Sequence, residues 1–144
     1  MQARKRVITF GEIMMRLSPP AQARFTQADH FKINFGGAEA NVAVALANMG
    51  IPSSFITHLP NSDLGIMATM HLQKHGVDTN CITYGDDRMG IYFYENGNSL
   101  RAPKVIYDRT ASAFSHIQPN TIDWDKIMST AGWFHWTGIT PAIS

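Results

Sequence analysis

The pattern of apolar and polar residues divides the chain into short apolar runs and longer segments of helical period. Three apolar runs bounded by glycine, proline or polar residues predict buried strands: Val7–Phe10, Ser54–Thr57 and Trp133–Thr137. The tryptophans of the last run are expected to lie in or near the core. Such runs are typical of a sheet covered on both faces.

The clearest helix is predicted over Ala38–Met49, where Gly50 provides a stop signal. Its buried face is expected to hold Val42, Ala45, Leu46 and Met49. A second helix is predicted from Asp63, a good N-cap residue, to Gly76, and a short one from Asp123 to about Ala131. These helices alternate with the predicted buried strands, which favours a parallel α/β layer.

Further strands, some of them rich in aromatic residues, are expected between these elements. The segments are Ile13–Leu17, part of Phe25–Phe35, Cys81–Tyr84, Ile91–Glu95 and Leu100–Tyr107. The sequence Asn96-Gly97-Asn98 predicts a tight hairpin turn between the last two. The expected fold is therefore an α/β layer with an antiparallel insertion.

Residues 1–144 are expected to form the N-terminal portion of one longer domain. The last predicted strand comes shortly before Ser144, and no helix follows that would cover the sheet. The alternative is a small complete α/β domain with an irregular tail.

Composition and charge limit the binding partners and the cellular compartment that we expect. Twelve basic and eleven acidic residues give a net charge of +1 and form no basic stripe, so nothing favours binding to nucleic acid or to an anionic membrane surface. No apolar run approaches membrane-spanning length. The single cysteine, Cys81, excludes an internal disulfide and fits a reducing compartment, so a cytoplasmic protein with a structural cysteine is expected.

Two local patterns suggest chemistry. Gly36 and Gly37 join a predicted strand to a helix, with Glu39 and Asn41 in the first turn, where their side chains are expected to reach outward. Taken alone, this junction is either a site for a polar ligand or a tight turn. His71 and His75 have a spacing that can bind zinc, but no glutamate follows the first, so a solvated helix face is favoured over a metal site.

A set of segments that occur in a fixed order is more specific than either local pattern. They are Phe10-Gly11-Glu12, Arg16-Leu17-Ser18-Pro19-Pro20, Gly36-Gly37-Ala38-Glu39-Ala40-Asn41-Val42-Ala43, Gly76-Val77-Asp78-Thr79, Gly90-Ile91-Tyr92, Tyr107-Asp108-Arg109 and Gly138-Ile139-Thr140-Pro141-Ala142. Together they resemble the N-terminal half of a PfkB/ribokinase-family sugar kinase, and the pattern is most similar to that of 2-keto-3-deoxygluconate kinases.

The resemblance implies a ribokinase-like α/β sandwich with a small β-sheet lid over the sugar site. Strands within about 13–35 and 81–107 would form the lid. Many members of the family dimerise through this lid, so a homo-oligomer is expected.

The resemblance also implies sugar-binding roles for Gly37, Asn41, Tyr92, Tyr107, Arg109 and Glu12. Arg109 would engage the carboxylate of a sugar acid, and Glu12 would hydrogen-bond sugar hydroxyls or shape the lid hinge. Arg16 is a weaker candidate for the same role as Glu12. The alternatives are cross-strand packing for the tyrosines, a surface charge near Asp108 for Arg109 and a solvated loop carboxylate for Glu12.

The implied activity is ATP-dependent phosphorylation of 2-keto-3-deoxygluconate or a related sugar acid. ATP and Mg²⁺ are expected for the full-length protein, but neither Gly-x-x-x-x-Gly-Lys-Ser/Thr nor Gly-x-Gly-x-x-Gly occurs in this chain. No residue here is assigned as catalytic or as a metal ligand, and the chain alone is expected to be inactive. The alternatives are a kinase for fructose, ribose or a nucleoside, and a non-catalytic, dimeric sugar-binding module.

Overall fold

The computed structural model describes residues 5–143. The strands are β1 Arg6–Phe10, β2 Met14–Ser18, β3 Lys32–Gly36, β4 Ser53–Ile56, β5 His58–Pro60, β6 Thr83–Gly85, β7 Ile91–Glu95, β8 Lys104–Asp108 and β9 Ala131–His135. The helices are α1 Ala38–Asn48, α2 Asp63–Lys74, α3 Trp124–Thr130 and α4 Thr140–Ile143, with 3₁₀ turns η1 Phe25–Gln27 and η2 Phe114–His116. Most predicted elements are confirmed to within a few residues.

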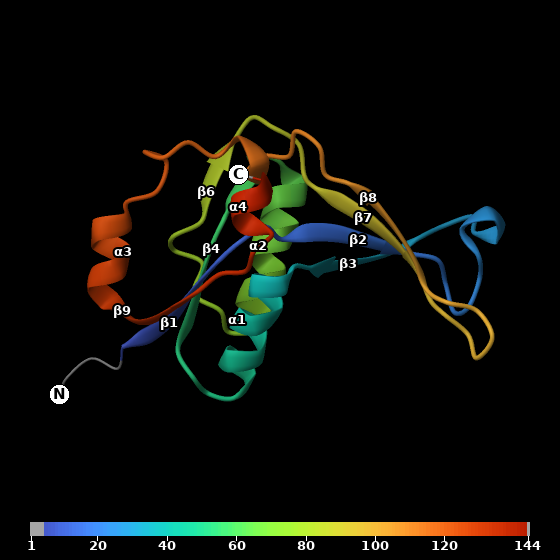
Figure 1. Ribbon diagram of the computed structural model, residues 1–144, viewed down its shortest axis with the longest axis horizontal. Helices are drawn as coiled ribbons and strands as arrows, with labels where there is room; N and C mark the ends of the chain where they lie inside the picture. The colour runs from blue at the N-terminus through green and yellow to red at the C-terminus, as the bar shows by residue number, and fades with distance from the viewer. Residues whose placement is uncertain (1–4, 144) are drawn as a thin grey trace.

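A parallel sheet in the order β4-β1-β9 forms the body of the molecule (Figure 1). Phe55 of β4 packs into one core with Ala43 of α1 and Leu72 of α2. Ile8 of β1 packs into a second core with Ile127 of α3. Helices thus lie on both faces of the sheet, as the parallel α/β prediction requires, with α1 and α2 on one face and α3 over part of the other.

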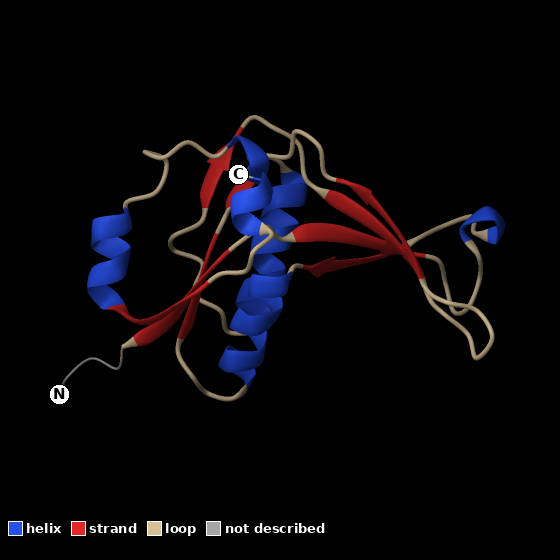
Figure 2. Cartoon of the chain, in the orientation of Figure 1, coloured by secondary structure: helices blue, strands red, loops and turns tan. Residues whose placement is uncertain are grey.

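A second sheet, in the order β3-β2-β7-β8, extends away from this body and is called the projecting sheet below (Figures 1 and 2). Its β2–β3 and β7–β8 pairs are antiparallel and its β2–β7 pair is parallel. The strand β6 pairs with β5 in a separate small sheet. The segment 81–107, expected to hold lid strands, thus contributes to the projecting sheet only from β7 onward.

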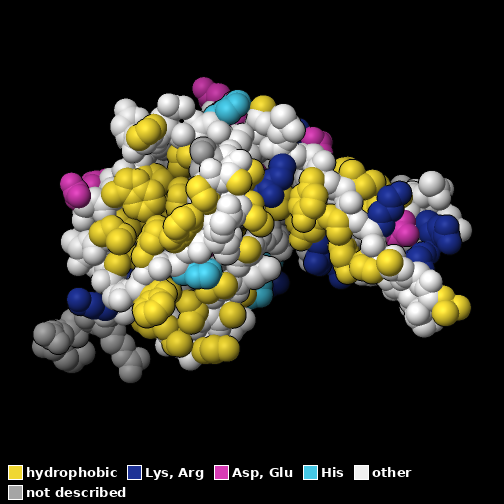
Figure 3. Space-filling view, in the orientation of Figure 1, with side chains coloured by type: hydrophobic (Ala, Val, Ile, Leu, Met, Phe, Trp, Pro, Cys, Tyr) yellow, Lys and Arg dark blue, Asp and Glu magenta, His cyan; other side chains and the backbone are white. Residues whose placement is uncertain are grey.

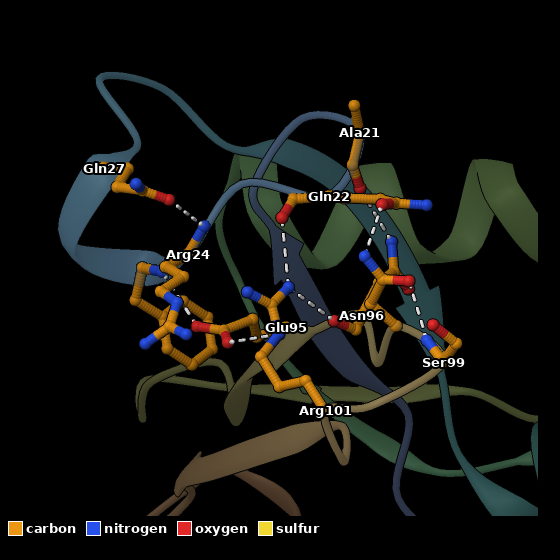
Figure 4. Close-up of polar contacts among 10 residues, drawn as sticks. Ala21, Gln22, Arg24, Gln27, Glu95, Asn96, Ser99 and Arg101 are labelled. Atoms are coloured by element: carbon orange, nitrogen blue, oxygen red, sulfur yellow. Dashed lines mark hydrogen bonds and ion pairs between the residues drawn. The ribbon is translucent and has the colours of Figure 1, made fainter.

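The distal end of the projecting sheet is held by polar side chains (Figure 4). The predicted tight turn at Asn96-Gly97-Asn98 is wrong. Asn98 and Arg101 exchange backbone hydrogen bonds of 2.8 and 2.7 Å, so the chain reverses within residues 98–101. Glu95, which is buried, accepts a hydrogen bond of 2.9 Å from the backbone N–H of Phe25 and pairs with Arg101 at 3.6 Å. These contacts fix the loop against η1.

The face of α1 that packs on the sheet differs from the predicted one. Ala40 and Ala43 are buried, whereas Met49, expected inside, is 74% exposed. Small side chains let the helix lie close to the sheet, and the Ser53 hydroxyl donates to the Ala43 carbonyl oxygen at 2.9 Å. The sequence is apolar around most of this helix, so its periodicity could not identify the packed side.

The tryptophans at the end of the chain are not in the core. Trp133 is 68% exposed and Trp136 is 52% exposed, while Phe134 packs against the second core. Within the described residues β9 pairs only with β1, so side chains on its free side lack neighbours. Figure 3 shows hydrophobic side chains gathered on this side of the molecule.

Among residues 5–143, no helix is both long enough and apolar enough to span a bilayer. No third His, Cys, Asp or Glu side chain in that range joins His71 and His75 in a group that could bind a metal ion.

Candidate functional site

The junction between β3 and α1 lies where the two sheets meet. Gly37 is the N-cap of α1, with an extended backbone (φ 176°) that any residue could adopt. A side chain at Gly37 would clash with the carbonyl oxygen of Glu12, and a Cβ at Gly36 would lie 2.6 Å from the Tyr92 hydroxyl oxygen. Close packing thus requires a glycine at position 37, where the helix start meets the backbone of the loop after β1, whereas the Tyr92 hydroxyl near Gly36 lies at the end of a side chain that can shift.

The buried carboxylate of Glu12 and the partly buried guanidinium of Arg109 form an ion pair beside this junction. Glu12, 5% exposed, lies between β1 and β2, and the Nε of Arg109 donates to its Oε2 at 2.9 Å, with Nη2 donating to the same oxygen. The Glu12 Oε1 atom is buried and accepts no hydrogen bond from the described residues. Neither expected alternative for these residues, a solvated loop carboxylate or a charge near Asp108, matches this geometry.

Asp108 binds a different arginine. Its Oδ1 accepts a hydrogen bond of 2.7 Å from Arg88 Nη1, and this contact lowers the pKa of Asp108. Asp108 is the last residue of β8 and Arg109 follows the strand, and the two side chains have different ion-pair partners.

Tyr92 and Tyr107 occupy directly paired positions on β7 and β8. Their rings are stacked, with centroids 5.9 Å apart and an interplanar angle of 30°. Burial raises the pKa of Tyr92. Tyr107 is 61% exposed, and the Arg109 guanidinium lies 5.9 Å from its ring centroid. The two tyrosines therefore do pack across the strands, and the exposed side chain of Tyr107 lies beside Arg109.

Asn41 lies one turn into α1 and is exposed, as the outward orientation predicted for it requires. Its backbone N–H donates to the Gly37 carbonyl oxygen at 2.8 Å. Its side chain makes no hydrogen bond within residues 5–143, so the amide is free to bind a ligand, and the contacts do not tie it to the tyrosines or to Arg109.

Glu39 behaves differently from the prediction. Its carboxylate is buried and accepts hydrogen bonds from the Thr137 N–H (3.0 Å), the Thr137 hydroxyl (2.5 Å) and the Thr140 hydroxyl (3.1 Å). It fixes the start of α1 to the loop after β9 and to the first residue of α4. Those threonines are about a hundred residues away along the chain, so no local pattern in the sequence could link them to Glu39.

Arg16 is a second cation near the tyrosine pair. It sits opposite Tyr92 in the parallel β2–β7 register, and its guanidinium lies 5.8 Å from the Tyr94 ring centroid. The cluster thus offers an aromatic wall, hydroxyl groups and arginine donors, a set suited to a small polyhydroxylated molecule bearing negative charge.

The comparisons with known proteins agree on one family. A family model described as pfkB family carbohydrate kinase matches residues 4–142. The 2-dehydro-3-deoxygalactonokinase of Haloferax volcanii is 40% identical over 138 residues, which are 96% of this chain and 43% of that protein. A probable fructokinase-3 of Arabidopsis thaliana is 27% identical over 135 residues, covering 93% of this chain and 39% of that protein.

A crystal structure of 2-dehydro-3-deoxygluconokinase from Thermotoga maritima superposes with a TM-score of 0.95 at 52% identity. The match covers 96% of this chain and 43% of that one. The chain therefore spans less than half the length of the relatives it matches, and its fold is that of their corresponding part.

Proposed function

The chain belongs to the PfkB family of carbohydrate kinases, and we propose that the protein containing it phosphorylates a 2-keto-3-deoxy sugar acid. The observation that carries this proposal is the stacked Tyr92–Tyr107 pair beside two arginines, Arg16 and Arg109, next to the Gly36-Gly37 junction. The similarity to sugar-acid kinases supports the same substrate class.

The residues of this chain would bind the acceptor sugar. Gly37 would present its backbone to the sugar, Asn41 offers an amide to hydroxyl groups, and the tyrosines supply hydroxyls and a ring wall. Glu12 occupies one edge of the Arg109 guanidinium, so the opposite edge remains available to the sugar. We therefore revise the role proposed for Glu12: it positions Arg109, because its own carboxylate is buried.

ATP and Mg²⁺ are proposed for the whole protein, but the residues of this chain do not fit them. The chain has no phosphate-binding glycine loop of the known types, and residues 5–143 hold no group of three potential metal ligands. We derive no step of phosphoryl transfer here and assign no catalytic base. The chain alone is proposed to be inactive.

We further propose that the projecting sheet is the lid of this domain and that two copies associate through it. Its outer strand β8 exposes Val105, Ile106 and Tyr107 by 42, 45 and 61%. A cytoplasmic location remains our proposal and rests on the single cysteine.

A neutral-sugar kinase is the second candidate, favoured by the similarity to a probable fructokinase. A coupled ATPase assay on the full-length protein separates the two. We expect kcat/KM for 2-keto-3-deoxygluconate or its galactonate epimer to exceed that for fructose and ribose by about tenfold or more. The reason is that a hydrogen-bonded ion pair between the sugar carboxylate and an arginine of the site would contribute this much selectivity. Equal or higher kcat/KM for the neutral sugars would overturn the proposal.

A further inference from the structure

The carboxylate of Glu39 lies in a slot between the carboxyl ends of two parallel strands. A Cβ placed on Gly11, directly after β1, would clash with its Oε2 atom. On the other side, its Oε1 atom accepts hydrogen bonds from Thr137, which follows β9, and from Thr140. The Thr140 hydroxyl also lies 3.4 Å from the carbonyl oxygen of Phe10, the last residue of β1. Glu39 thus joins the start of α1 to the ends of two neighbouring strands.

The burial of this carboxylate is not balanced by a positive side chain. Glu39 is 3% exposed, and none of the ion pairs within residues 5–143 includes it. Its donors are one backbone N–H and two hydroxyls, and its place in the first turn of α1 adds the favourable field of a helix start. An apolar side chain of similar volume often holds two elements together equally well. A fully hydrogen-bonded carboxylate differs because it fixes a single geometry.

The segment that Glu39 holds lies at the edge of the sheet where ligands bind in α/β folds. Open parallel sheets bind their ligands outside the carboxyl ends of the strands, and Thr137 follows β9 at that end. Gly37 and Asn41, which we propose as sugar contacts, flank Glu39 on the same helix start. The position of residues 136–140 relative to these two contacts is therefore set through Glu39.

We propose that Glu39 is a positioning residue for turnover, because it holds the loop after β9 at one position beside the start of α1. It acts through this loop and not through contact with the sugar. Without the link, the loop and the helix start can shift relative to each other, and a misplacement of about 1 Å can cost about 100-fold in rate. The loss falls on kcat, since Gly37 and Asn41 still bind the sugar. This inference rests on the proposed function.

The test uses the full-length protein as wild type, Glu39→Gln, Thr140→Val, the double variant and Ser53→Ala. We measure kcat per folded molecule with 2-keto-3-deoxygluconate, the affinity for this sugar by titration calorimetry without ATP, and hydrogen exchange in residues 136–140. Ser53→Ala is the matched control. It removes a buried hydrogen bond of 2.9 Å to the carbonyl oxygen of Ala43 on the same helix, away from the helix start.

We expect Glu39→Gln to lower kcat about tenfold and to speed exchange in the loop about tenfold, with the dissociation constant for the sugar within about twofold of wild type. Thr140→Val should lower kcat less, because the two donors of Thr137 remain. The double variant should be no slower than Glu39→Gln, since both changes break the same link. Ser53→Ala should keep kcat within about twofold of wild type, although it also destabilises the fold.

Equal kcat in Glu39→Gln and Ser53→Ala would overturn the Glu39 assignment and leave the proposed function standing. A change in sugar affinity without a change in kcat would do the same. If the wild-type protein does not phosphorylate 2-keto-3-deoxy sugar acids, the proposed function is overturned and the Glu39 assignment falls with it.

Discussion

Gly37 is the residue at which the start of α1 packs against the backbone of the loop between β1 and β2. The space is taken by the Glu12 carbonyl oxygen, a backbone atom that cannot rotate away. Because Glu12 also holds Arg109, a shift here would move the arginine as well. One glycine thus couples backbone packing to the geometry of the site.

Replacing Gly37 with alanine should therefore destabilise the fold by about 1–3 kcal/mol, the usual cost of overpacking. Gly138→Ala is the matched control, because no atom lies within 4 Å of a Cβ placed there. Urea denaturation of both variants measures the difference. Equal stability of the two variants would show that the contact with Glu12 is not restrictive.

Glu39 is the residue whose importance the sequence did not reveal. Changing it to glutamine removes a charged acceptor that serves three donors, so the free energy of unfolding should fall by about 1–3 kcal/mol. Asp86→Asn, at an exposed carboxylate in a turn, should have almost no effect. Denaturation midpoints that match for the two variants would contradict a structural role for Glu39.

At the scale of elements, the sequence could predict strands and helices because their signals are local. Glycine stops, N-cap residues and apolar runs located β1, α1, α2 and β7 nearly to the residue. The buried side of α1 and the turn after β7 were missed because both depend on distant partners. Ala43 packs against β4, and the loop after β7 follows the contact of Arg101 with the Gln22 carbonyl oxygen.

At the candidate site, too, the residues could be predicted but the contacts between distant residues could not. The resemblance identified Tyr92, Tyr107, Arg109 and Glu12, and the structure brings these four together. The resemblance could not show that Glu12 and Arg109 are bound to each other, because these residues are 97 positions apart in the sequence.

The end of the projecting sheet should be ordered by Glu95 (Figure 4). In Glu95→Gln the acceptor for Phe25 is weakened and the charge opposite Arg101 is lost. Amide hydrogen exchange in residues 96–103 should then be about tenfold faster, while α1 stays unchanged. Asp29→Asn, at an exposed carboxylate near η1, is the control; equal exchange rates in both variants would rule out this role.

At the scale of the whole molecule, the structure combines the face that we propose for acceptor binding with an exposed apolar side. A hollow of about 470 Å³ is lined by Phe10, Trp124, Met128, Phe134, Trp136, Thr140 and Pro141. Exposed apolar surface of this kind favours association, so the isolated chain should bind a dye such as anilinonaphthalene sulfonate and self-associate. A monodisperse monomer that leaves the dye unbound would contradict this expectation.

The central claim is that this chain binds the acceptor sugar acid, and titration calorimetry without ATP tests it most directly. The full-length protein should bind one 2-keto-3-deoxygluconate per chain. Asn41→Ala removes an exposed amide without structural partners, so it should weaken binding about tenfold at an unchanged unfolding temperature. Absence of binding by the wild type, or equal affinity in both proteins, would contradict the account.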